Sequence, residues 1–212
     1  MTRSLFVSGA LLFGSGCADP PSLGRIAAQP NCAGLDRACL EEGFGAPLAV
    51  GTSVELELDV WTAPSTTPPL TLRAATDAIE VQGHRVAALD EGVTSILILD
   101  PAGEVLDVLH IWTQDGDAVS LRAVDRNTPG EISSALSMAV GDTLDFSVVL
   151  ERDGYDLMGT PPVTLDVEGS SVSAGPGPID GTLRVRAEAA GSARVSVISG
   201  ELSATLDVEV QA

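Results

Sequence analysis

The stretch Leu48-Ala-Val-Gly-Thr-Ser-Val-Glu-Leu-Glu-Leu58 decides how this chain is expected to fold. From Val54 to Val60, apolar residues alternate with acidic ones, so that a strand here would bury one face and expose the other to water. Gly51 permits the tight turn that leads into this strand. The stretch therefore predicts a half-buried β-strand that is entered from a turn.

The same pattern returns 90 residues later as Met138-Ala-Val-Gly-Asp-Thr-Leu-Asp-Phe-Ser-Val148. Three more pairs of segments follow in the same order: Leu70-Thr-Leu72 with Val163-Thr-Leu165, residues 91–98 with 190–197, and a closing Leu-Asp-Val at Leu106 and at Leu206. Four ordered matches indicate two copies of one structural unit.

Short apolar runs separated by Gly, Pro, Asp or Ser continue through both copies. Besides the strands already mentioned, the predicted strands are residues 85–89, 94–99, 105–112, 119–124, 144–150, 183–187, 193–198 and 205–210. Only residues 35–42 suggest a turn of helix. Strands this short, at this spacing, are typical of a β-sandwich or a β-barrel.

Three motifs of the second copy carry a family resemblance: Val140-Gly-Asp-Thr143, Ala189-Ala-Gly-Ser-Ala-Arg-Val-Ser-Val197, and the alternating valines of residues 206–210. The unit resembles the bacterial immunoglobulin-like domains of group 2. Leu72 and Leu165 stand roughly where that family usually has a tryptophan. The resemblance implies an all-β protein with two tandem immunoglobulin-like β-sandwiches, which we expect at residues 45–115 and 116–212.

The first residues, MTRSLFVSGALLFGSGC, resemble the signal of a bacterial lipoprotein. Arg3 supplies the basic start, residues 5–13 form an apolar run too short to span a bilayer, and small residues lead to Cys17. The resemblance implies a signal peptide of residues 1–16, a lipid on Cys17, and location in the cell envelope. Ala18 favours the outer membrane in the lipoprotein sorting pattern. The alternative is an ordinary secretory signal followed by a structural thiol.

Cys32 and Cys39 remain once Cys17 is assigned to the lipid. In an oxidising compartment we expect them to form a disulfide that closes a small loop. A zinc site is the alternative, but two thiols without a nearby histidine supply too few ligands. We expect this loop to lie in a flexible lipidated tether of residues 17–44.

Composition argues against several classes of function. The formal net charge is −19, which repels phosphate backbones, so we expect no nucleic-acid partner. The basic residues are all arginines, so Schiff-base chemistry and a phosphate-binding P-loop lysine are excluded. The only histidines are His84 and His110, and no Gly-x-Ser-x-Gly motif between a strand and a helix accompanies them. We therefore predict that the protein is not an enzyme; a hydrolase with an atypical site at either histidine is the remote alternative.

Asp115 and Asp117 flank a glycine at the expected domain boundary. Carboxylates there could share a calcium ion, but Asp-Gly is also a common turn signal, and we favour the turn and expect no cofactor. Trp61 and Trp112 are the only tryptophans. They are expected to fill the core, although an exposed pair could stack on sugar rings.

These observations predict a non-enzymatic envelope lipoprotein whose sandwiches act as spacers and as adhesion or protein-interaction modules. The expected partners are the membrane, through the N-terminal lipid, and a protein or a glycan. The alternative is a structural accessory of an envelope complex that faces the periplasm.

Overall fold

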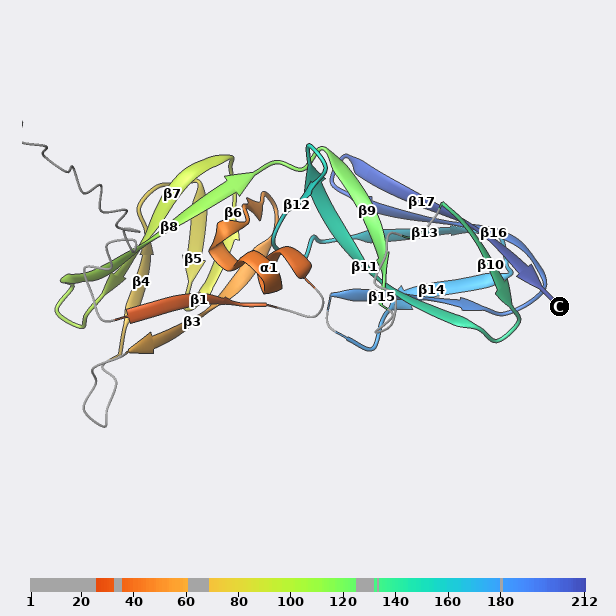
Figure 1. Ribbon diagram of the computed structural model, residues 1–212, viewed down its shortest axis with the longest axis horizontal. Helices are drawn as coiled ribbons and strands as arrows, with labels where there is room; N and C mark the ends of the chain where they lie inside the picture. Colours follow the sequence, from red (N-terminus) through yellow and green to blue (C-terminus); the bar gives the residue numbers. More distant parts are fainter. Residues whose placement is uncertain (1–25, 33–35, 61–68, 125–131, 133, 180) are drawn as a thin grey trace, which may run out of the picture.

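Figure 1 shows a computed structural model of the chain, which describes residues 26–32, 36–60, 69–124, 132, 134–179 and 181–212. The expected signal peptide, the lipidation site Cys17 and Trp61 lie outside the described residues. None of the helices within the described ranges is long and apolar enough to cross a membrane.

The first half of the chain folds into two facing four-stranded sheets. One sheet has the order β1 (Ile26–Asn31), β3 (Ser53–Val60), β6 (Arg85–Ala88) and β5 (Ile79–Gln82). The other has the order β2 (Leu48–Ala49), β8 (Val105–Gln114), β7 (Gly92–Leu99) and β4 (Thr71–Ala74). All pairs are antiparallel except the parallel pair β2–β8. This is the arrangement of an immunoglobulin-like sandwich, in which strands A, B, E and D face strands C, F and G.

The second half repeats this layout. In one sheet, β11 (Thr143–Arg152) pairs with β9 (Ala118–Ala123) and with β15 (Thr182–Ala187), and β15 pairs with β14 (Val172–Pro176). The other sheet has the order β10 (Ala135–Ala139), β17 (Leu202–Gln211), β16 (Gly191–Ser199) and β13 (Thr164–Glu168). A two-residue strand, β12 (Tyr155–Asp156), extends β11 as a hairpin. The predicted all-β, immunoglobulin-like fold is therefore confirmed.

The sequence repeat corresponds to equivalent strands in the two halves. The matched segments fall at the starts of β3 and β11, in β4 and β13, in β7 and β16, and in β8 and β17. The shared turn before β3 and β11 places Gly51 at φ 82° and Gly141 at φ 92°. Glycine is needed there because a Cβ atom disfavours positive φ.

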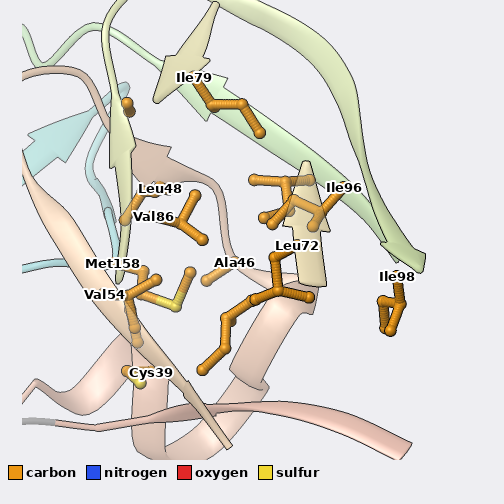
Figure 2. Packing of buried hydrophobic residues seen from close by; sticks show 14 of the residues in the cluster. Cys39, Ala46, Leu48, Val54, Leu72, Ile79, Val86, Ile96, Ile98 and Met158 are labelled. Carbon is orange, nitrogen blue, oxygen red and sulfur yellow. The ribbon is translucent and has the colours of Figure 1, made fainter. Parts of the chain in front are cut away.

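Each sandwich has its own aliphatic core. In β3, Val54 and Leu56 are buried while Glu55 and Glu57 are exposed, as the alternating pattern predicts. Figure 2 shows the first core, in which Leu48, Val86 and Ile96 are completely buried. The second core surrounds Phe146, one of only four phenylalanines in the chain.

The expectation of a flexible tether up to residue 44 is wrong for the described residues 26–32 and 36–44. β1 pairs with β3 along its whole length, from Ile26 opposite Val60 to Asn31 opposite Glu55. The first sandwich therefore includes β1 and does not begin at residue 45. β1 lacks an alternating pattern and contains Pro30, so its sequence is like that of a linker. A proline is nevertheless tolerated in a strand at the edge of a sheet.

A short helix follows β1, close to the segment where the sequence suggests one. It is α1 (Arg37–Glu42), and a 3-10 turn, η1 (Gly43–Gly45), continues it to the start of β2. Asp36 caps the helix, because its side chain accepts a hydrogen bond from the Cys39 amide.

Candidate functional site at the junction of the sandwiches

The two sandwiches are joined by more than the linker between β8 and β9. After β12, the chain turns back toward the first sandwich and runs beside β2. Met158 N donates to Pro47 O at 2.8 Å, and Ala49 N donates to Met158 O at 2.9 Å. The Met158 side chain is fully buried in the core of the first sandwich, although its segment belongs to the second half of the chain. We call residues Leu157, Met158 and Gly159 the docking segment.

Gly159 closes the docking segment against Thr52. A Cβ atom at position 159 would overlap Thr52 Oγ1 and lie 2.7 Å from Thr52 Cβ. Thr52 cannot easily move away, since it is buried and its hydroxyl donates to Ala49 O at 2.7 Å. Gly159 also has φ 107°, where side chains are disfavoured. Only glycine therefore fits this position without rearrangement.

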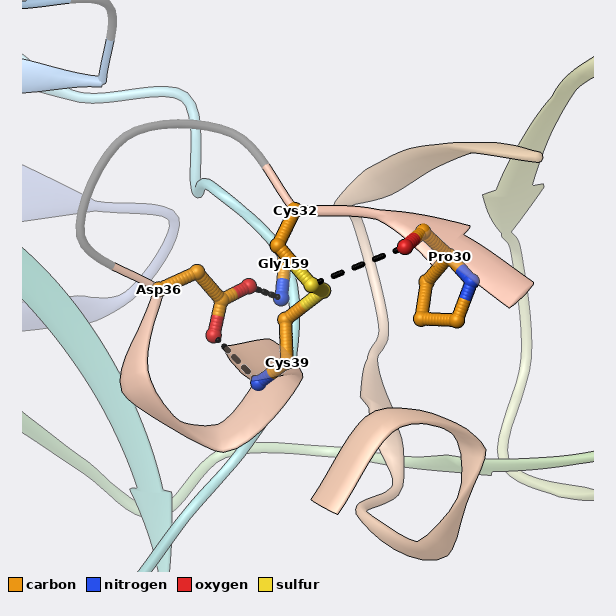
Figure 3. The surroundings of a disulfide bond; sticks show 5 residues. All are labelled: Pro30, Cys32, Asp36, Cys39 and Gly159. Atoms are coloured by element: carbon orange, nitrogen blue, oxygen red, sulfur yellow. Dashed lines mark hydrogen bonds between the residues drawn. A yellow bond between two sulfur atoms is a disulfide. The ribbon is translucent and has the colours of Figure 1, made fainter. Parts of the chain in front are cut away.

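Asp36 links the docking segment to helix α1, as Figure 3 shows. Its Oδ1 accepts the Cys39 amide at 3.0 Å, and its Oδ2 accepts the Gly159 amide at 2.6 Å. Burial raises the pKa of the Asp36 carboxyl above its usual value, although both amide hydrogen bonds act to lower it. One side chain thus caps a helix of the first sandwich and binds the backbone of the second.

The predicted disulfide is present and fixes this helix. Cys32, directly after β1, is bonded to Cys39 in α1. Cys39 is almost completely buried in the first core. The bond ties α1 to the end of β1, and thereby holds Asp36 in position for Gly159.

A small apolar cluster fills the junction beside the docking segment. Ala49, Leu150 and Leu157 are buried together, with Val119 and Leu202 packed against them. Because these residues come from both sandwiches, separating the halves would expose apolar surface to water. The junction is therefore a packed joint and not a free hinge.

The linker carries the two aspartates that the sequence marks as weak calcium candidates. Asp117 Oδ2 accepts the Asp153 amide at 3.1 Å, and Asp117 N donates to Glu151 O at 2.8 Å. Arg152 donates to the Asp115 carbonyl at 3.3 Å. These contacts tie the linker to the β11–β12 turn. Within the described part of the chain, no group of three or more His, Cys, Asp or Glu side chains could hold a metal ion.

The structure does not bring the two histidines together in one site. His84 is exposed in the turn between β5 and β6. His110 is exposed on β8, and its Nδ1 lies 2.8 Å from Ser95 Oγ on the neighbouring β7. A hydrolytic triad also needs a carboxylate that orients the histidine, and no such hydrogen bond to His110 occurs among the described residues.

A cleft of about 510 Å³ opens beside the docking segment, between α1, the end of β8 and the β11–β12 hairpin. Trp112 and Tyr155 line it and are 49% and 78% exposed. Trp112 is thus a surface residue, and the expectation that it fills the core is wrong. Arg37, Arg122 and Arg152 also line the cleft. The sequence gives no sign of this cleft, because its walls are far apart along the chain.

Comparison with known proteins adds little to this geometry. No protein-family model matches the chain, and no curated protein matches it. Among solved structures, domains 4 and 5 of the S-layer protein SbsC have 15% sequence identity and a TM-score of 0.34, over 88% of this chain and 98% of that one. The Escherichia coli adhesin FdeC has 12% identity and a TM-score of 0.34, over 91% of this chain and 66% of that one. The Yersinia pseudotuberculosis adhesin InvE has 12% identity and a TM-score of 0.33, over 79% of this chain and 57% of that one. Scores this low carry no argument about function.

Proposed function

We propose that this protein is a non-enzymatic spacer of the bacterial cell envelope, anchored by a lipid on Cys17. It holds two immunoglobulin-like sandwiches in one fixed arrangement and presents the distal one to a protein or glycan partner. The docking segment is the observation that carries this proposal. Met158 lies in the core of the first sandwich, and this contact would hold the two halves in one arrangement.

The direction of the chain fits such a spacer. Ile26 pairs with Val60, at the end of the first sandwich away from the junction, and the C-terminal strand β17 ends at the opposite end of the long axis (Figure 1). A lipid on Cys17 would precede Ile26 by nine residues, which can span at most about 30 Å. The anchor would thus hold the first sandwich near the membrane and direct the second one away from it.

The same reasoning supports a role without catalysis. The Ser95–His110 pair lies on an exposed sheet face, where water would compete for every hydrogen bond of a reacting group. Rigid sandwiches with exposed strands and loops suit recognition, since loops on a fixed scaffold commonly carry binding.

Membrane fractionation with Cys17→Ala and Ala18→Ser tests the anchor. We expect Cys17→Ala to leave the membrane fraction, because the variant lacks the thiol that would carry the lipid. Ala18→Ser, the neighbouring control, should stay with the membrane. Membrane association of Cys17→Ala equal to that of the wild type would contradict a lipid at this position.

Protease treatment of intact cells distinguishes the two envelope roles. Digestion of the sandwiches without lysis supports a surface adhesion or interaction module. Protection until the envelope is opened instead supports the periplasmic accessory, which would require a stoichiometric partner in the same compartment.

A further inference from the structure

We propose that the cleft at the junction is a binding site for an uncharged saccharide, which stacks on Trp112 and Tyr155. The inference goes beyond the spacer role and depends on the joint only for the shape of the cleft. A volume of about 510 Å³ lies within the range of small-molecule sites, and such sites favour domain interfaces.

The aromatic side chains supply the first part of the argument. Tyr155 is the only tyrosine, and Trp112 is one of two tryptophans in a chain that is 3% aromatic. Both line the same cleft, where Trp112 is 49% and Tyr155 78% exposed. The exposed part of an aromatic side chain gains nothing from burial in its own fold, so it is available to a ligand. The apolar faces of sugar rings pack well against such rings.

The charged side chains supply the second part, because two of the three arginines of the cleft have carboxylate partners at hydrogen-bond distance. Arg37 Nε lies 2.7 Å from Glu41, and Arg122 Nη2 lies 2.6 Å from Asp156 and 3.0 Å from Glu151. The third, Arg152, has its Nε 3.8 Å from Asp153 and 3.9 Å from Asp117. An anionic ligand at Arg37 or Arg122 would have to displace a carboxylate. A neutral polyhydroxyl ligand avoids this displacement, since its hydroxyls donate to carboxylates and accept from guanidinium groups at once.

The joint supplies the third part, because it fixes the walls of the cleft before any ligand arrives. Trp112 comes from the first sandwich and Tyr155 from the second, and the docking segment starts two residues after Tyr155. The turn before Tyr155 is itself held, since Asp117 accepts the Asp153 amide. A preformed site loses little conformational entropy on binding.

Fluorescence titration of the full mature chain tests the proposal. The background is Trp61→Phe with Cys17→Ala, which leaves Trp112 as the only indole and keeps the protein soluble whether or not the native chain is lipid-anchored. The probes are cellobiose, maltose and N,N′-diacetylchitobiose, each to tens of millimolar. We expect a saturable change in Trp112 emission with at least one of them.

Substitutions of Tyr155 test whether the sugar binds in this cleft. Tyr155→Ala should weaken binding about five- to tenfold, which corresponds to the loss of one aromatic contact. Tyr155→Phe keeps the ring and should bind within about twofold. Leu89→Ala removes another exposed apolar side chain, which lies outside the cleft, and should change nothing.

Two results would overturn the proposal. One is the absence of a saturable response to all three sugars. The other is a response that Tyr155→Ala leaves unchanged. Neither of these results tests the lipid anchor, which is tested by membrane fractionation of Cys17→Ala. The saccharide proposal can therefore be refuted without refuting the spacer proposal, and the reverse is also true.

Discussion

Substituting Gly159 by alanine tests whether the two sandwiches form one rigid body. The new Cβ atom would overlap Thr52 Oγ1 and lie 2.7 Å from Thr52 Cβ, at a backbone φ of 107°. Holding a side chain in such a conformation costs about 1–3 kcal/mol. Moving the segment away also breaks the 2.6 Å hydrogen bond from Gly159 to the Asp36 carboxylate, worth about 1.5–3 kcal/mol.

Together these effects weaken docking by about 2.5–6 kcal/mol, which changes the ratio of docked to undocked molecules by roughly seventyfold or more. We expect the wild type to unfold in one calorimetric transition and Gly159→Ala to unfold in two. The transition of the first sandwich should move to lower temperature, because Met158 leaves its core. Small-angle X-ray scattering should report a wider distribution of shapes for the variant.

Gly103→Ala is the matched control. Gly103 has φ 85° in the turn between β7 and β8, but a Cβ atom there would meet nothing within 4 Å. This variant has the backbone cost without the overlap, and it should keep a single transition. If Gly159→Ala matches Gly103→Ala in both calorimetry and scattering, the docking segment does not hold the sandwiches together.

Three further outcomes are expected. Replacing Cys32 and Cys39 together by serine should lower the free energy of unfolding by about 2–3 kcal/mol in chemical denaturation, because the unfolded chain loses a closed loop; an unchanged midpoint would contradict this. Met158→Ala should destabilise the first sandwich by about 2–5 kcal/mol, whereas Phe146→Ala should destabilise the second by about 3–5 kcal/mol, which residue-resolved hydrogen exchange can distinguish. Because burial raises the pKa of Asp36, the native state binds this proton more tightly than the unfolded state, and the associated stability is lost as the pH rises through the native pKa. The free energy of unfolding of the wild type, relative to Asp36→Asn, should therefore fall as the pH rises above about 4 in urea titrations; a rise would contradict the sign.

The strands with alternating patterns were predictable because alternation is a local property of the sequence. Val54 and Leu56 alternate with acids, so any fold that buries one face of this segment must make it a strand. The disulfide was also predictable, since Cys32 and Cys39 are close along the chain. Three edge strands of four or five residues, β5, β10 and β14, were missed. The equally short edge strands β4 and β13 were found because their segments match each other in the repeat.

The junction could not be predicted from any local pattern. Thr52 Oγ1 and Met158 O approach to 3.4 Å across 106 residues of sequence, and the Asp36–Gly159 hydrogen bond spans 123. Leu157-Met-Gly159 has the composition of an ordinary loop, and nothing in it indicates that its methionine completes another sandwich's core. The cleft could not be predicted either, because Trp112 and Tyr155 line the same cavity only when the two sandwiches are joined.

The all-β class, the two-fold repeat, the disulfide and most strands of the two cores follow from local patterns, because alternation, turn glycines and cysteine spacing act within a few residues. In contrast, the place of β1 in the first sandwich and the packed joint between the sandwiches arise from long-range contacts. These contacts depend on surfaces that exist only after each sandwich has formed, since partners more than a hundred residues apart meet through shape and buried area and not through any pattern along the chain.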